Sequence, residues 1–113
     1  MKRDEFAKNL AAGAIGLIVL DVLRDGPSYG YGIRQRICDQ SNHTLQWPEG
    51  SLYRVLRHLE AQGLVTSTWQ GRHDGRRRRY YSLSAQGRRV WHAQRQRWLT
   101  FASAMNSVLA LHL

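Results

Sequence analysis

Hydroxyl and guanidinium side chains, the groups that bind phosphates and the edges of bases, gather at two places in this sequence. The first lies within residues 47–63, where apolar residues recur at i, i+3, i+4 and i+7 and predict one buried face of an α-helix. The opposite face carries Arg54, Arg57 and His58, with Ser51 and Tyr53 near the N-terminal end of the helix. This division is typical of a helix that reads a DNA major groove, and a solvated surface helix can look the same.

The second place is the arginine run of residues 76–79, which follows a turn containing Asp74 and Gly75. The flanking segments 64–69 and 80–83 are rich in β-branched and aromatic residues, so the sequence predicts a β-hairpin with the arginines near its tip. Side chains alternate along a strand, and two of the four arginines therefore point away from the packed face. We expect Arg76, Arg77, Arg78 and Arg79 to contact phosphate or the minor groove, the alternative being a merely solvated charge run.

These groups need a scaffold, and the hydrophobic pattern predicts one. Helices are expected over residues 4–24, 29–40 and 47–63, followed at once by the hairpin and by a last helix from residue 85 towards residue 113. The predicted fold is mainly α with a small β-hairpin, in the order of a winged helix-turn-helix. We expect two units, a DNA-binding winged helix-turn-helix at residues 1–84 and a long C-terminal dimerisation helix at residues 85–113.

The second helix has an unusual start. Ser28 is a good N-cap, yet Gly30 and Gly32 in the first turn each cost about 1 kcal/mol relative to alanine. Close approach of the backbone to a neighbouring helix or to a phosphate would compensate for this cost. We expect Tyr29 and the N–H of Gly30 to lie where a helix N-terminus can bind phosphate. For Tyr31, a place in the core is equally consistent with the pattern.

The last helix has a strongly apolar second half. Trp91, Trp98 and Met105 are spaced by seven residues, with Phe101 beside them, which suits helix–helix packing. The first helix is apolar nearly all round, more than a small domain can cover alone. A second subunit is the expected cover. Paired indoles of Trp91 and Trp98 could then hold a flat aromatic effector at the dimer seam, or they are ordinary packing.

The basic composition of the chain indicates a negatively charged binding partner. The 113 residues carry a net charge of +9, with fifteen arginines against two lysines, which favours bidentate recognition of phosphate or guanine. A single cysteine, Cys38, fits a reducing cytoplasm. The apolar run of residues 10–20 is too short to span a bilayer and lacks the flanks of a signal peptide, so no membrane partner is expected.

Metal binding and catalysis are not expected. Cys38 and His43 are the best-spaced pair of ligands, but one thiol without a nearby second ligand pair is a poor zinc set, and no cofactor motif is present. The five histidines and eight carboxylates form no recognisable catalytic spacing, which argues against an enzyme.

Several ordered motifs resemble the PadR family of transcriptional regulators, in its short form with one C-terminal helix. They are the segments 29–33 (Tyr-Gly-Tyr-Gly-Ile), 49–53 (Glu-Gly-Ser-Leu-Tyr), 63–65 (Gly-Leu-Val) and 80–84 (Tyr-Tyr-Ser-Leu-Ser), followed by Gly87. The resemblance spans about residues 15–90. Arg54, His58 and Ser84 depart from the residues frequent in the family, and these departures concern the operator sequence rather than the fold.

The resemblance implies a homodimer in which the C-terminal helix packs against the first helix of the partner. It also implies a repressor of its own or a neighbouring operon that binds a palindromic operator and is released by a small molecule or signal. On the recognition helix we assign Ser51, Tyr53, Arg54 and Arg57 to DNA, with Arg54 the candidate for a bidentate guanine contact. A basic RNA-binding or architectural protein and a protein-binding scaffold are the alternatives.

Overall fold

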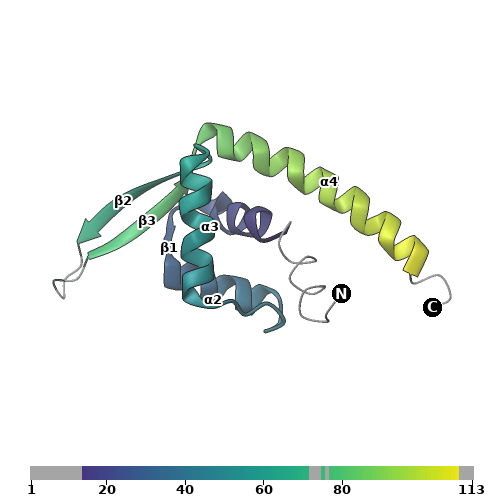
Figure 1. The fold of residues 1–113 in the computed structure, drawn as a ribbon, viewed down its shortest axis with the longest axis horizontal. Coiled ribbons are helices and arrows are strands. Elements are labelled where there is room, and N and C mark those ends of the chain that lie inside the picture. The colour runs from purple at the N-terminus through teal and green to yellow at the C-terminus, as the bar shows by residue number, and fades with distance from the viewer. Residues whose placement is uncertain (1–13, 72–74, 76, 110–113) are drawn as a thin grey trace.

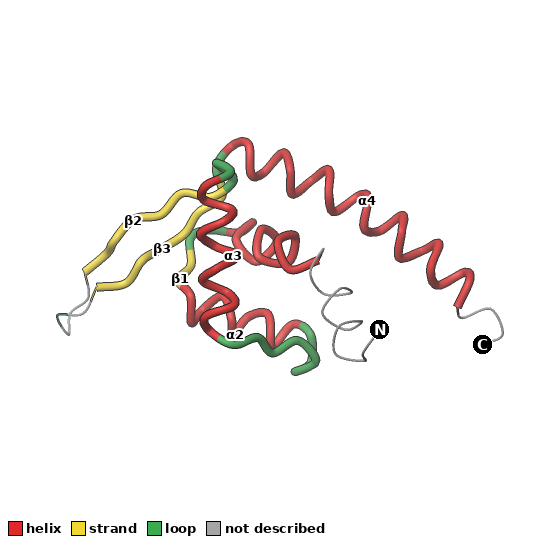
Figure 2. Tube along the Cα trace, viewed as in Figure 1, coloured by secondary structure: helices red, strands yellow, loops and turns green. Residues whose placement is uncertain are grey.

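The computed structural model describes residues 14–71, 75 and 77–109 (Figures 1 and 2). An N-terminal helical segment, residues 14–22, continues into a 3-10 turn, η1 (Leu23–Asp25). The helices α2 (Gly30–Gln40) and α3 (Glu49–Ala61) follow. Residues 4–13 of the predicted first helix lie outside the described part.

The wing is a small antiparallel sheet. Its hairpin strands are β2 (Val65–Gly71) and β3 (Arg77–Leu83), and a third strand, β1 (Ser28–Tyr29), pairs with the other side of β3. Trp69 lies opposite Arg79, and Tyr29 lies opposite Tyr80. The sequence predicted the hairpin but missed β1, because a two-residue strand leaves no periodic signal and depends on a partner about fifty residues away.

Pairing in β1 also corrects the predicted start of the second helix. Ser28 is a strand residue rather than the N-cap, Tyr29 occupies the cap position, and no side-chain hydrogen bond caps α2 in the described part of the chain. The last helix begins at the predicted residue, Ala85. The Ser84 hydroxyl accepts a hydrogen bond from the N–H of Gly87 at 2.9 Å, as an N-cap does at the start of α4 (Ala85–Leu109).

The core lies between the helices and the base of the wing. It contains the apolar face that the sequence predicted for α3, with the expected helical spacing, together with Ile33 and Ile37 of α2. The fully buried side chains are Val19, Val22, Leu23, Ile33, Leu52, Leu56 and Val65. Tyr81 is also buried, whereas Tyr31 is 61 % exposed, so the core position considered for Tyr31 is wrong.

Helix α4 leaves the wing base and extends along one side of the molecule (Figure 1). Its first turn crosses the beginning of β2 so closely that a Cβ on Gly87 would lie 1.9 Å from the carbonyl oxygen of Leu64. A glycine is therefore required at this crossing. None of the helices in the described ranges has the length and hydropathy of a membrane span.

Candidate nucleic-acid interface

Helix α3 divides as the sequence predicted. Leu52, Leu56 and Leu59 are buried, and Arg54 and Arg57 on other faces are exposed. Ser51 is half-buried near the N-terminal end of the helix. Pro48 is the N-cap residue, and its carbonyl accepts the first turn's hydrogen bonds. Gly63, with a φ of +76°, follows the C-cap Gln62 and terminates the helix. These two ends fix which arginines project from the surface.

Tyr53 has a structural contact that its assignment to DNA did not include. A Cβ on Gly30 would lie 2.6 Å from the Tyr53 hydroxyl oxygen, so only glycine lets the start of α2 come this close to α3. Of the two compensations considered for Gly30, close approach to a neighbouring helix is therefore present. Tyr53 is half-buried, and it helps to position the two helices relative to each other.

A groove of about 810 Å³ separates α3 from the wing. Aromatic rings and guanidinium groups line most of it, with one carboxylate. The lining residues are Tyr29, Tyr31, Tyr53, Arg57, Glu60, Trp69, Arg77, Arg78, Arg79 and Tyr81. Burial raises the pKa of Tyr81 from its ordinary value, against a smaller opposing effect of Arg79, so this phenol stays neutral at physiological pH.

Each described arginine of the run lies over an aromatic ring. The guanidinium carbons of Arg77 and Arg79 lie 5.6 and 5.5 Å from the ring centroid of Trp69, and that of Arg78 lies 4.1 Å from the ring of Tyr29. Such cation–π contacts hold the guanidinium plane while its N–H edge can still donate to an anion. The wing thus presents oriented rather than freely rotating charges.

The four arginines are not equivalent, however. Arg79 donates to the Ser67 hydroxyl at 2.9 Å and lies 3.5 Å from the Glu60 carboxylate, to which Ser67 also donates. Arg79 therefore links the wing to α3, and its charge is partly compensated within the chain. Arg77 is exposed and Arg78 is partly exposed, whereas Arg76 lies outside the described residues.

The four residues predicted at an effector or dimer seam fall into two groups. The indole N–H of Trp91 donates to the Asp21 carboxylate at 2.8 Å, and the ring packs on the core of its own chain. Trp98, Phe101 and Met105 are instead exposed, and the rings of Trp98 and Phe101 lie 5.9 Å apart. Trp91 and Trp98 therefore have different surroundings in the single chain.

A second cavity, of about 430 Å³, lies beside Trp98 between the N-terminal helical segment, the end of α2 and α4. Most of its surface is apolar. It is lined by Ala14, Leu17, Ile18, Asp21, Val22, Ile37, Gln40, Ser41, Leu45, Arg95, Trp98 and Leu99. Its size is within the range of sites that hold small organic molecules.

Comparison with known proteins shows which family and which solved structures this chain resembles. Residues 19–93 match the model of the family described as "Transcriptional regulator PadR-like family". A transcriptional regulator from Clostridium thermocellum is 25 % identical with a TM-score of 0.81, the match covering 89 % of this chain and 98 % of that one. A PadR family transcriptional regulator from Eggerthella lenta is 28 % identical with a TM-score of 0.77, covering 94 % and 90 %.

A more distant structure shares the fold alone. PadR from Bacillus subtilis, solved in complex with operator DNA, is 20 % identical with a TM-score of 0.66, and the match covers 72 % of this chain and 46 % of that one. The family model covers most of the chain, including α3, the wing and the start of α4. The protein therefore belongs to the PadR-like family of transcriptional regulators.

Proposed function

We propose that this regulator, which by its family is not an enzyme, is a homodimeric repressor that binds a palindromic operator in its own or a neighbouring operon. The observation that carries the proposal is the groove in which Arg57 of α3 faces wing arginines that are oriented by aromatic rings. Arg54 is exposed on the neighbouring side of α3, towards the N-terminal helical segment. The operator complex of the Bacillus subtilis PadR supports this use of the shared fold.

Within this proposal the side chains have different roles. Ser51 and Arg54, on the N-terminal half of α3, read base edges in the major groove, and a bidentate arginine–guanine contact is worth about 1–3 kcal/mol of discrimination. Arg57, Arg77 and Arg78 contact phosphates. Tyr53 positions α3 through its contact with Gly30.

The start of α2 offers a further phosphate contact. The N–H groups of its first turn, beginning at Gly30, carry the positive end of the helix dipole. The Tyr29 ring lies next to them and holds Arg78 at 4.1 Å. We assign to this corner a contact that sets the register of the protein on DNA without reading sequence.

The dimer rests on α4. Trp98, Leu99, Phe101, Val108 and Leu109 are between 46 and 73 % exposed in the single chain. Apolar groups gathered in this way are typical of an interaction surface, and burial contributes about 25 cal/mol per Å². A second copy of α4, packed against this strip and the N-terminal helical segment, would cover it and hold two recognition helices at a fixed spacing.

An effector fits the cavity beside Trp98. Its apolar lining and its volume of about 430 Å³ suit a small aromatic molecule. Because the cavity joins α4 to the N-terminal helical segment and the end of α2, a ligand there would change the angle between α4 and the DNA-binding unit. Release of the operator would follow from altered spacing of the two recognition helices.

The test is a fluorescence-anisotropy titration of the protein against its own upstream region, with a shuffled duplex and a matched RNA as competitors. We expect tight binding to the upstream region alone. Arg54→Ala should weaken this binding by about 1–3 kcal/mol and leave binding to the shuffled duplex nearly unchanged. Arg97→Ala is the matched control, since it removes the same charge from an exposed position on α4.

Equal affinity for the upstream duplex, the shuffled duplex and the RNA would contradict the proposal. It would favour the alternative of a basic RNA-binding or architectural protein. Equal losses for Arg54→Ala and Arg97→Ala would show that Arg54 contributes charge and reads no base.

A further inference from the structure

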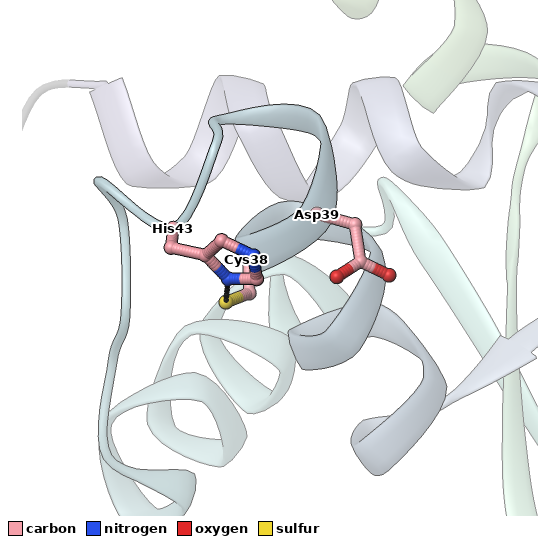
Figure 3. Close-up of side chains that lie close together, drawn as sticks. All are labelled: Cys38, Asp39 and His43. Carbon is pink, nitrogen blue, oxygen red and sulfur yellow. Dashed lines mark hydrogen bonds between the residues drawn. The ribbon is translucent and has the colours of Figure 1, made fainter.

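Three side chains with metal-binding atoms meet where α2 ends (Figure 3). The Sγ of Cys38 lies 3.1 Å from Nδ1 of His43, and the ligand atoms of Cys38, Asp39 and His43 all lie within 4.8 Å of one another. No metal was expected from the sequence, because it shows a single thiol without a nearby second ligand pair. The folded turn brings these two residues together and adds Asp39.

The end of α2 explains this meeting. The N–H of His43 donates to the carbonyl of Cys38 at 2.8 Å, and that of Asn42 donates to the carbonyl of Asp39 at 3.2 Å. Asn42 has a φ of +53°. These bonds define a Schellman motif, which brings the residue two positions beyond the C-cap next to the third residue from the helix end. Here those two residues are His43 and Cys38.

The same motif ends α3, but the two helices carry different side chains at the corresponding positions. There the N–H of Leu64 donates to the carbonyl of Leu59 at 2.9 Å, with Gly63 in the left-handed position. The corresponding side chains, Leu59 and Leu64, are both buried in the core, and apolar residues at these two positions often accompany the motif. The motif at the end of α2 carries a thiol and an imidazole at the two positions where α3 has leucines.

Neighbouring side chains restrain two of these three residues. Gln35 donates to Oδ1 of Asp39 at 3.1 Å, which orients the carboxylate. Gln46 donates to the backbone carbonyl of His43 at 2.8 Å and holds the loop that carries the imidazole. The C-terminal end of a helix also carries the negative end of its dipole, which favours a cation.

We propose that Cys38, Asp39 and His43 bind one divalent metal ion of the zinc class. Thiolate, imidazole and carboxylate are ligands that Zn²⁺ accepts together, and three protein ligands leave a fourth position for water. On binding, the thiol releases its proton to solvent, and the imidazole coordinates through an unprotonated nitrogen. In tetrahedral geometry the sulfur and nitrogen ligands would lie about 3.6 Å apart, so the observed 3.1 Å needs only a small rotation of the side chains.

The ion would link the last turn of α2 to the loop that leads into α3. This loop is the turn of the helix-turn-helix, so occupancy would stabilise the relative placement of these two helices. Binding to the folded chain also raises its stability by mass action. The metal site itself does not depend on the proposed DNA binding, and it is tested without DNA.

The test is a titration of the full-length, reduced protein with Co²⁺ as the spectroscopic probe for Zn²⁺. Cys38 is the only cysteine, so a thiolate-to-cobalt charge-transfer band in the near ultraviolet can arise from this residue alone. We expect the band to saturate at one ion per chain and to disappear when Zn²⁺ is added. Cys38→Ser should abolish it, and Asp39→Asn and His43→Gln should weaken binding by about tenfold or more.

His58→Gln is the matched control, because His58 is also exposed but lies on α3. It should bind Co²⁺ as the unaltered protein does, and far-ultraviolet circular dichroism should show every variant folded. Absence of the band, or its persistence at full strength in His43→Gln, would overturn the proposal. Saturation at half an ion per chain would also overturn it, by placing the metal between the thiols of two chains.

Discussion

Two exposed surfaces of this molecule differ in how their side chains are held. On the wing, Arg77, Arg78 and Arg79 each lie over an aromatic ring, and Arg79 is also tied to Glu60. Along α4, Trp98 and Phe101 are about half exposed, and their ring centroids lie 5.9 Å apart. The charged surface is organised within one chain, whereas the apolar surface, in our proposal, is completed by a second copy.

The largest expected effect follows from adding charge to the apolar surface. Trp98→Glu together with Phe101→Glu should raise the dimer dissociation constant by about 100-fold or more, because each buried aromatic ring contributes a few kcal/mol. Sedimentation equilibrium measures this. Arg97→Glu and Arg89→Glu, exposed positions on the same helix, should have a much smaller effect. If the double variant has the same mass in solution as the unaltered protein, the α4 interface is refuted.

The second-largest expected effect is at Gly87, where the start of α4 packs on the base of the wing. In most helices Gly→Ala is stabilising by up to about 1 kcal/mol. Gly87→Ala should instead lower the free energy of unfolding by about 1–3 kcal/mol, because its Cβ would lie 1.9 Å from the Leu64 carbonyl oxygen. Urea denaturation measures the change.

Gly50→Ala provides the contrast for this substitution. Nothing lies within 4 Å of a Cβ at Gly50, which is also in a first helical turn, so alanine there should be neutral or stabilising. Equal changes at the two glycines would mean that α4 is not docked on the wing base through Gly87.

A smaller effect should distinguish two arginines that share the Trp69 ring. Arg77→Ala should reduce the slope of log affinity for the operator against log salt by about one unit while leaving stability unchanged. Arg79→Ala should lower the free energy of unfolding by up to about 1 kcal/mol, because Glu60 loses its partner, and should change the salt slope less. Salt-dependent anisotropy and urea denaturation of both variants decide between these roles.

The smallest effect is a pH dependence confined to the wing. Burial raises the pKa of Tyr81 above the ordinary 10.0, so the folded protein keeps this proton longer than the unfolded chain. The contribution of Tyr81 to stability is fully present below pH 10 and is lost as pH rises through the folded pKa. The unfolding free energy of Tyr81→Phe should therefore fall less steeply above pH 10. Tyr31→Phe, exposed on α2, should follow the unaltered protein.

The sequence was sufficient wherever one local pattern decides the structure. Leu52, Leu56 and Leu59 repeat at helical spacing, Gly63 ends their helix, and Ser84 caps the next. The sequence was insufficient where distant residues pair. Strand β1 depends on the far side of β3, and Ser28, a good cap by itself, is a strand residue because of that pairing.

The interface could be predicted in outline but not in detail. Exposure of Arg54 and Arg57 follows from helical periodicity alone. The distinct role of Arg79 requires the register that places it opposite Trp69, and a hairpin turn of unknown length leaves that register open. The Cys38–His43 pair likewise depends on a left-handed residue at Asn42, a position for which sequence alone suggests glycine more often.

Hydroxyl-radical footprinting of the protein on its own upstream region reports on the recognition helices and on the α4 interface in one experiment. Two recognition helices held by paired α4 helices should protect two segments whose centres lie about 10–10.5 base pairs, or a multiple of this, apart. Trp98→Glu with Phe101→Glu should lose this paired pattern at the same protein concentration. Uniform protection along the duplex, or the same pattern on a shuffled sequence, would contradict the account.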